Sequence, residues 1–307
     1  MSRGKSINLY LMDGDSGGRI KCTLANWTGV AYRIPRTDIE KCRNREDLKQ
    51  SGVYLLFGVS DETGNPVVYV GQAGSRKNGE GLLNRLLEHK RNPDKDYWTE
   101  AVALTTTNNS FGQTEISYLE NQFCSLAREA KRYDVQNSIE PTSGNITEEK
   151  ECELEEFVEY AQLIIGTLGH KVFVPLTKQE SADTFGSEDA ADSEAFETEL
   201  FLTRKLRKPS FTVQGHAKRT SEGFVVLKGS VISPESTKNI SLGIRARRKA
   251  AAVNNDHVLQ EDVLCSSPSG AAAFVIGNAA NGWEAWKTQD GTSLQDLEGR
   301  TILTDEG

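Results

Sequence analysis

Two tyrosines stand in neighbouring short apolar runs of the chain, where their hydroxyl groups could take part in proton transfer. Tyr54 belongs to VYLLFGV and Tyr69 to PVVYVG, and the turn-forming SDETGN joins the two runs. This pattern predicts a β-hairpin with both side chains on one face of the sheet. Because aromatic residues favour strands in general, the pair by itself is explained as ordinary strand aromatics.

An arginine and a histidine follow at helical spacing. Arg85 and His89 lie four residues apart in a predicted helix over residues 81–91, so both side chains project from one side of it, one turn apart. Leucines occupy the neighbouring face, which would pack on the core. The simpler interpretation is a solvated basic surface that continues through Lys90 and Arg91.

Glu120 lies on the apolar side of a second predicted helix, over residues 113–132. At about 100° per residue its direction falls within the stripe of apolar side chains. A carboxylate on a core-facing side is costly unless a cation or a hydrogen-bond donor meets it. Glu120 is therefore either a residue at the edge of the stripe that reaches water, or a metal ligand or catalytic carboxylate.

Together these residue types suit the hydrolysis of a phosphodiester. That reaction requires a base for water, a cation for the anionic transition state, and assistance to the leaving oxygen. Tyrosine, arginine, histidine and glutamate could supply these functions jointly, although no single one of them requires this interpretation.

The order of the short motifs resembles the GIY-YIG nuclease superfamily. GVY at 52–54, YVG at 69–71, an Arg-x-x-x-His helix and a Leu-Glu helix follow one another between about residues 45 and 137. The resemblance implies an α+β fold in which helices flank a small, mostly antiparallel central sheet. It also implies a metal-dependent endonuclease that acts on nucleic acid, with DNA favoured over RNA.

The resemblance also assigns roles to the residues that match the motifs. It makes Glu120 the ligand of a divalent metal, Mg²⁺ or Mn²⁺. Tyr54 or Tyr69 would orient or deprotonate the attacking water. Arg85 would bind the scissile phosphate, and His89 would support a tyrosine or the phosphate.

Two positions depart from the family pattern. The late asparagine of the family corresponds to Asn137, which would contact nucleic acid, at a longer spacing from Glu120 than in the repair members. Gln72 stands where some members carry a lysine, so a phosphate contact from this position is not implied.

Two rival functions stay open at this point. A non-catalytic nucleic-acid-binding module could keep the same fold. Such a module would not need all five candidate catalytic residues, and this chain has kept all of them. A nuclease-like toxin or defence effector controlled by a partner would use the same chemistry as the nuclease itself.

The expected elements form two main domains. From residue 52 onwards the predicted order is β-β-α-β-α-α, which places a nuclease-like domain at 46–178. A small β element at residues 1–45 precedes it. Residues 179–200 have the composition of an acidic linker, and residues 201–307 are predicted to form a small α+β domain.

This second domain looks like a domain of unknown function that often follows GIY-YIG domains. From residue 201 to 260 it carries twelve Lys or Arg against three acidic residues, so it could bind phosphates, or alternatively a protein partner. The segment GWEAWK is predicted to be its last short strand. The basic residues expected to contact nucleic acid are Arg245, Arg247, Arg248 and Lys249.

Composition excludes several other classes of protein. The 307-residue chain has a net charge of −8 and five cysteines without a CxxC pair, so neither a zinc site nor a disulfide framework is expected. No apolar run is long enough to span a bilayer, and the first residues lack the apolar core of a secretory signal. A cytoplasmic protein without membrane contact is therefore expected.

Overall fold

The computed structural model describes residues 4–74, 81–139, 141–142, 146–176, 198–207 and 210–298, with Asp94 described by its backbone alone. The chain divides into two compact units, Ser2–Pro175 and Leu176–Gly307, which we call the first and the second unit. Of the acidic linker expected at residues 179–200, only the last three residues lie within the described chain.

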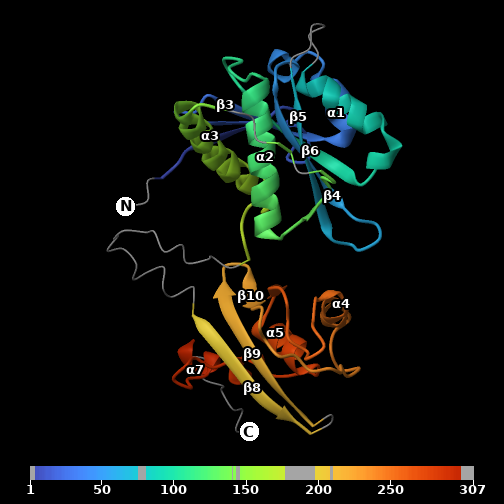
Figure 1. Ribbon diagram of the computed structural model, residues 1–307, viewed down its shortest axis with the longest axis vertical. Coiled ribbons are helices and arrows are strands. Elements are labelled where there is room, and N and C mark those ends of the chain that lie inside the picture. The colour runs from blue at the N-terminus through green and yellow to red at the C-terminus, as the bar shows by residue number, and fades with distance from the viewer. Residues whose placement is uncertain are drawn as a thin grey trace. The chain divides into compact units, whose positions relative to one another are not determined.

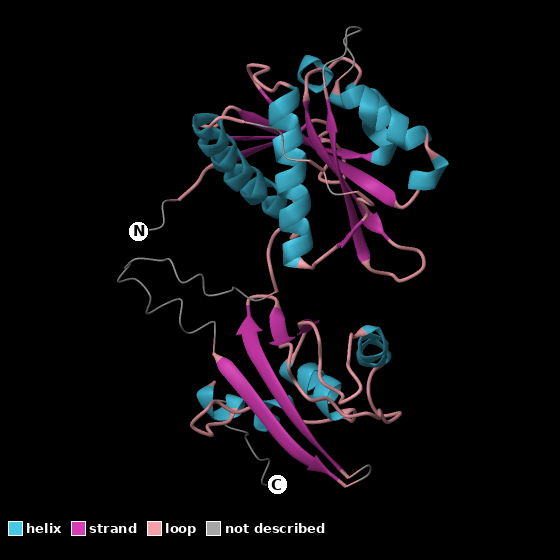
Figure 2. Cartoon of the chain, in the orientation of Figure 1, coloured by secondary structure: helices cyan, strands magenta, loops and turns pink. Residues whose placement is uncertain are grey.

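The first unit is built on one seven-stranded sheet (Figures 1 and 2). The strand order is β1-β2-β3-β6-β4-β5-β7, and all neighbours are antiparallel except β5 and β7. The three N-terminal strands are part of this sheet, because β3 pairs along its whole length with β6, and the sheet is therefore larger than expected. The strands are β1 Ile7–Leu11, β2 Ile20–Leu24, β3 Gly29–Pro35, β4 Gly52–Val59, β5 Pro66–Ala73, β6 Trp98–Thr106 and β7 Asp134–Val135.

Helices cover both faces of this sheet (Figure 1). One face packs on α2 (Gln113–Ala130) and α3 (Glu148–Thr167). The other face packs on α1 (Leu82–Arg91) and on two short 3-10 helices at Arg36–Cys42 and Glu46–Lys49. The strand and helix order predicted from residue 52 onwards is found except for the unpredicted short strand β7 between α2 and α3, and the fold is α+β.

The central strand β4 shows how alternation divides the two faces. Val53 and Leu55 point into the core shared with α2 and α3, whereas Tyr54 and Leu56 point into the core shared with α1. Since successive side chains of a strand point to opposite faces, a strand buried on both sides must be apolar throughout. Tyr54 is the hydroxyl-bearing exception, and it is wholly buried.

The glycines of the two tyrosine motifs leave room for close packing. Gly71 lies directly opposite Tyr54 in the β4–β5 pairing. A Cβ atom on Gly71 would stand only 2.3 Å from the hydroxyl oxygen of Tyr54. A Cβ atom on Gly52 would likewise stand 2.3 Å from the carbonyl oxygen of Leu104. Both positions therefore require glycine for steric reasons, whatever the backbone conformation.

The second unit consists of a four-stranded antiparallel sheet of order β11-β10-β9-β8 with helices packed on it. The mostly apolar helix α5 begins at the Ser267 cap and ends at Gly277, which has a φ of 75°. The elements are β8 Glu199–Leu206, β9 Phe211–Thr220, β10 Gly223–Val226, α4 Leu242–Ala250, β11 Val263–Cys265, α5 Pro268–Ile276, α6 Gly282–Ala285 and α7 Leu294–Leu297.

The strand predicted for GWEAWK is wrong, because this segment forms the single helical turn α6. The Asn281 side chain accepts a hydrogen bond from the backbone of Trp283 and so starts the turn. Gly282 lies so close to Pro268 that a Cβ atom would stand 2.1 Å from the Pro268 carbonyl oxygen. Trp286 is wholly buried and donates from its indole nitrogen to Pro268, so tertiary packing decides the local structure.

Within the described residues, no helix has the length and apolar character needed to cross a bilayer.

Gly71→Ala should destabilise the first unit by about 1–3 kcal/mol, the usual cost of forcing an extra methyl group into a packed site. Gly166→Ala, in α3, is the matched control, because a Cβ atom there meets nothing within 4 Å and alanine favours a helix. Urea denaturation of both variants measures the difference. Equal midpoints for Gly71→Ala and the wild type would show that the Tyr54 ring does not need this glycine.

Candidate active site

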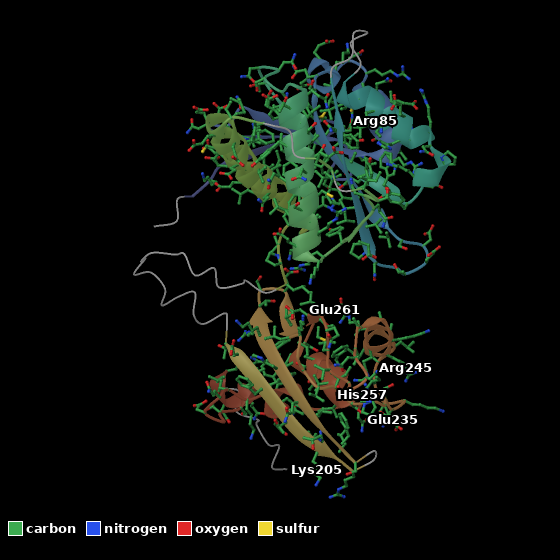
Figure 3. All side chains as sticks on the ribbon, in the orientation of Figure 1. Arg85, Lys205, Glu235, Arg245, His257 and Glu261 are labelled. Carbon is green, nitrogen blue, oxygen red and sulfur yellow. The ribbon has the colours of Figure 1, made fainter. Side chains whose placement is uncertain are left out.

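The predicted site residues gather around the outer edge of β5. The short strand β7 pairs only with Val67 and Val68, and no other strand of the described chain pairs with that edge. On the α1 side of the edge lie the two tyrosines with Arg85 and His89. On the α2 side lies Glu120. Figure 3 labels Arg85 on α1.

Tyr54 and His89 form a buried hydrogen-bonded pair. The Tyr54 hydroxyl lies 2.6 Å from Nε2 of His89, and the two residues are 0% and 3% exposed. The positive charge of Arg85 acts on the same hydroxyl and opposes the rise in its pKa. Which member of the Tyr54–His89 bond donates depends on the tautomer of His89, because a neutral imidazole nitrogen either carries a proton or accepts one.

Burial keeps both members of this pair uncharged. Burial, followed by the charges of Lys95 and Arg85, lowers the pKa of His89 to about 3. Burial and the neighbouring Tyr69 raise the pKa of Tyr54 well above its usual range. At neutral pH the pair is therefore a fixed hydrogen-bonded support, and neither member is poised to exchange a proton with solvent.

Tyr69 is the tyrosine that a substrate can reach, because it is only partly buried. Its ring centroid lies 6.4 Å from that of Tyr54 and 5.4 Å from that of His89. Burial and the charge of Glu120 raise the pKa of Tyr69, whereas the charge of Arg85 opposes this shift. A change in the positive charge near Tyr69 would therefore change how readily it releases its proton.

Arg85 lies on the wall of an open pocket of about 230 Å³ at the end of β5. Its guanidinium donates to Glu88, one turn further along α1, at 2.6 Å, and its charge opposes the rise in the pKa of both tyrosines. Glu88 therefore orients the guanidinium, while the Arg85 side chain stays 39% exposed. The pocket is lined by Gln72, Ala73, Gly74, Gly81, Asn84, Arg85 and Glu88.

Glu120 meets the edge of β5 through Gln72, whose amide nitrogen donates to its carboxylate at 2.9 Å. The amide oxygen of Gln72 accepts from Gln113 at 3.0 Å and from Ser117 at 3.2 Å, so the amide orientation is defined by three contacts. Burial raises the pKa of Glu120, and the Gln72 hydrogen bond and the Arg85 charge only partly offset this. A half-buried carboxylate in this state would be stabilised by a cation.

The donor set around Glu120 suits only one kind of metal. In the described part of the chain, no three or more His, Cys, Asp or Glu side chains come together to hold an ion. Zinc usually requires three or four such ligands, so it does not fit. Mg²⁺ keeps several waters and binds through one or two carboxylates plus substrate phosphate. The residues present fit a hard divalent ion bound in this way.

Asn137 has a structural role in this edge. Its side-chain oxygen accepts from the backbone nitrogen of Val70 at 3.0 Å, and its amide nitrogen donates to the Val70 carbonyl at 2.8 Å. The amide thus takes the place of a strand partner just beyond β7. The expected contact of Asn137 with nucleic acid would have to break this double hydrogen bond.

The basic residues of α4 do not act as one set. Arg248 is turned inward and donates to the backbone carbonyls of Phe274, Ser233 and Glu235. Burial lowers the pKa of its guanidinium, but the three acceptors satisfy it. Arg248 is therefore a structural residue, contrary to its expected contact with nucleic acid. Arg247 and Lys249 are exposed and Arg245 is partly exposed, so these three remain accessible.

Sequence reasoning missed Lys95, whose amine lies 3.2 Å from the ring centroid of Tyr69. Lys95 ends a short 3-10 turn, Pro93–Lys95, between α1 and β6. A lysine in a loop has neither periodicity nor a motif that could indicate its position, so no signal in the sequence pointed to it.

Comparison with known proteins informs the second unit only. Residues 206–298 match the family model described as Domain of unknown function (DUF4357), in agreement with the domain of unknown function expected there. No curated protein and no solved structure matches the chain. The matched family carries no stated activity, so function must be argued from the site in the first unit.

His89→Gln should make the stability of the first unit less sensitive to acid. The folded protein keeps His89 neutral down to about pH 3, whereas the unfolded chain binds a proton near pH 6.5. The unfolded state therefore gains protons as the pH falls below about 6.5, and the wild type loses stability there. Glutamine does not titrate. Urea denaturation midpoints at pH 7.5 and pH 5 measure how much stability the wild type and His89→Gln each lose between the two pH values.

His257→Gln, in the second unit, is the control, and the first unit of this variant should lose as much stability between the two pH values as the wild type does. The assignment is wrong if His89→Gln loses as much stability between the two pH values as the wild type.

Proposed function

We propose that the first unit is a metal-dependent endonuclease of the GIY-YIG type. The observation that carries the proposal is the meeting of Tyr69, Arg85 and Glu120, from three separate elements, around one open strand edge. No GIY-YIG family model matches the chain, so the proposal rests on this geometry and on the order of the motifs. Nucleic acid is the substrate, with DNA favoured over RNA.

Each group has a distinct part in the proposed reaction. Arg85 binds the scissile phosphate, because its planar fork matches two phosphate oxygens. Tyr69 orients the attacking water and, once it has released its own proton to solvent, accepts the proton of that water as the phenolate, a form that the positive charge of Arg85 favours. Glu120 holds a divalent ion, Mg²⁺ or Mn²⁺. When bound, such an ion neutralises charge on the phosphate and makes water more acidic.

The buried pair Tyr54–His89 acts one step further from the substrate. Its buried hydrogen bond anchors α1, the helix that carries Arg85, to the central strand β4, and so fixes the position of Arg85 before substrate arrives. Preorganised donors of this kind cost no rearrangement during the reaction. Tyr54 and His89 are thus positioning residues in this proposal.

Glu120 also favours catalysis over simple binding. A module that only bound nucleic acid would gain nothing from a half-buried carboxylate beside its phosphate site, because the two anions repel each other. A divalent ion converts this repulsion into attraction. Control of the nuclease by a partner, as in a toxin or defence effector, would leave the same chemistry in place.

In the second unit, Arg245, Arg247 and Lys249 are proposed to add affinity for nucleic acid. The cluster is free of acidic residues from Ser241 to Ala250, and each basic side chain that reaches a phosphate releases counterions. Binding of a protein partner by this unit is the alternative.

Glu120→Gln should abolish cleavage, and Tyr69→Phe should slow it by about 10²-fold or more. The first change removes the metal-binding charge and the second removes a single hydroxyl. Labelled DNA and RNA substrates, single- and double-stranded, with Mg²⁺, Mn²⁺ or EDTA, measure the rates. Glu129→Gln is the matched control, because Glu129 is an exposed carboxylate of the same helix α2. Wild-type rates in Glu120→Gln would refute the metal site.

Replacing Arg245, Arg247 and Lys249 together by Gln should reduce the salt dependence of nucleic-acid binding. Each lost phosphate contact should lower the slope of log K against log salt by about 0.7–0.9. Binding is measured with the full chain carrying Glu120→Gln. Arg248→Gln is the contrasting variant, and should instead lower the stability of the second unit. An unchanged slope in the triple variant would mean that these charges are only solvated and would favour a protein partner.

A further inference from the structure

Lys95 brings a second positive charge to the site. Its amine lies 3.2 Å from the centroid of the Tyr69 ring, in the range of a close cation–π contact. Among the described residues, no carboxylate forms an ion pair with it. Within the described chain this partly buried ammonium group therefore has no anionic partner.

The loop that carries Lys95 is held in place by Arg36. This guanidinium donates to four backbone carbonyls between α1 and β6 and lies 4.8 Å from the centroid of the Trp98 ring. The acceptors are the carbonyls of Lys90 at 3.2 Å, Lys95 at 3.4 Å, Asp96 at 3.0 Å and Trp98 at 3.2 Å. The backbone of Lys95 is thus positioned by the first residue of the 3-10 helix that follows β3.

Lys95 and Arg85 lie close enough to repel each other. Burial and then the charge of Arg85 lower the pKa of Lys95 to about 8, so the amine stays largely protonated at pH 7. Two like charges beside one tyrosine are unfavourable in the free protein. An anion that contacts both would remove this repulsion, and a polyanion could do so with two adjacent phosphates.

We propose that Lys95 binds a substrate phosphate that neighbours the one held by Arg85, so that the nucleic-acid strand runs across the face of Tyr69. This inference rests on the proposed function, and it adds a residue that sets the path of the strand. Lys95 binds a backbone phosphate and reads no base, so its contribution is independent of sequence.

The test uses the full chain with Glu120→Gln and a labelled single-stranded oligonucleotide across a salt series. Lys95→Gln should weaken binding and reduce the salt slope by about 0.7, and Lys95→Arg should restore both. Lys90→Gln is the matched control, because Lys90 lies in the last turn of α1, shortly before the turn that carries Lys95, and already pairs with Glu40 at 3.2 Å. Its binding should equal that of the parent. Melting curves confirm that each variant is folded.

A second series locates the phosphate. In this series a single neutral methylphosphonate replaces each phosphate of the oligonucleotide in turn. The parent protein should bind more weakly when the replacement stands at one position beside the scissile phosphate. Lys95→Gln should show no additional loss of affinity at that position, because the lysine that contacts this phosphate is already removed. Equal penalties at every position in both proteins, or an unchanged affinity in Lys95→Gln, would overturn the inference. Cleavage plays no part in these measurements, so a failure of the proposed nuclease activity would be seen separately.

Discussion

The hydrogen bond between Tyr54 and His89 is the interaction on which the candidate site depends. It joins the central strand β4 to helix α1 inside the core, at 2.6 Å, and leaving either group unpaired there would cost roughly 1–3 kcal/mol. Because His89 is fixed, Arg85 one turn earlier is directed at the two tyrosines. Gly71 is part of the same constraint, since only a residue without a side chain leaves room for the Tyr54 ring.

The second constraint is the open edge of β5. Edge strands expose backbone groups that must be paired or covered, and here β7 and the amide of Asn137 satisfy the edge only as far as Val70. Beyond this point Gln72 donates to Glu120 on the α2 face, while the charge of Arg85 on the α1 side still acts on that carboxylate. The edge therefore brings together side chains from both faces, which a central strand would keep apart.

Local patterns predicted much of this arrangement. The hairpin carrying Tyr54 and Tyr69, and the helices carrying Arg85 and Glu120, followed from alternation and helical spacing. The position of Lys95 did not, because Arg36 sets it through long-range contacts to backbone carbonyls. The inward direction of Arg248 depends on carbonyl groups distant in sequence, and the helical turn before Trp286 depends on tertiary packing. These features arise from contacts that no local pattern records.

The central claim is that Glu120 and the phosphate held by Arg85 share one divalent ion. Anomalous diffraction from crystals of the full chain with Mn²⁺ and a phosphorothioate oligonucleotide tests it most directly. The account predicts a manganese peak within bonding distance of the Glu120 carboxylate and of a backbone phosphate, and no such peak in Glu120→Gln. Bound oligonucleotide with manganese absent from Glu120, or the same peak in the variant, would contradict it.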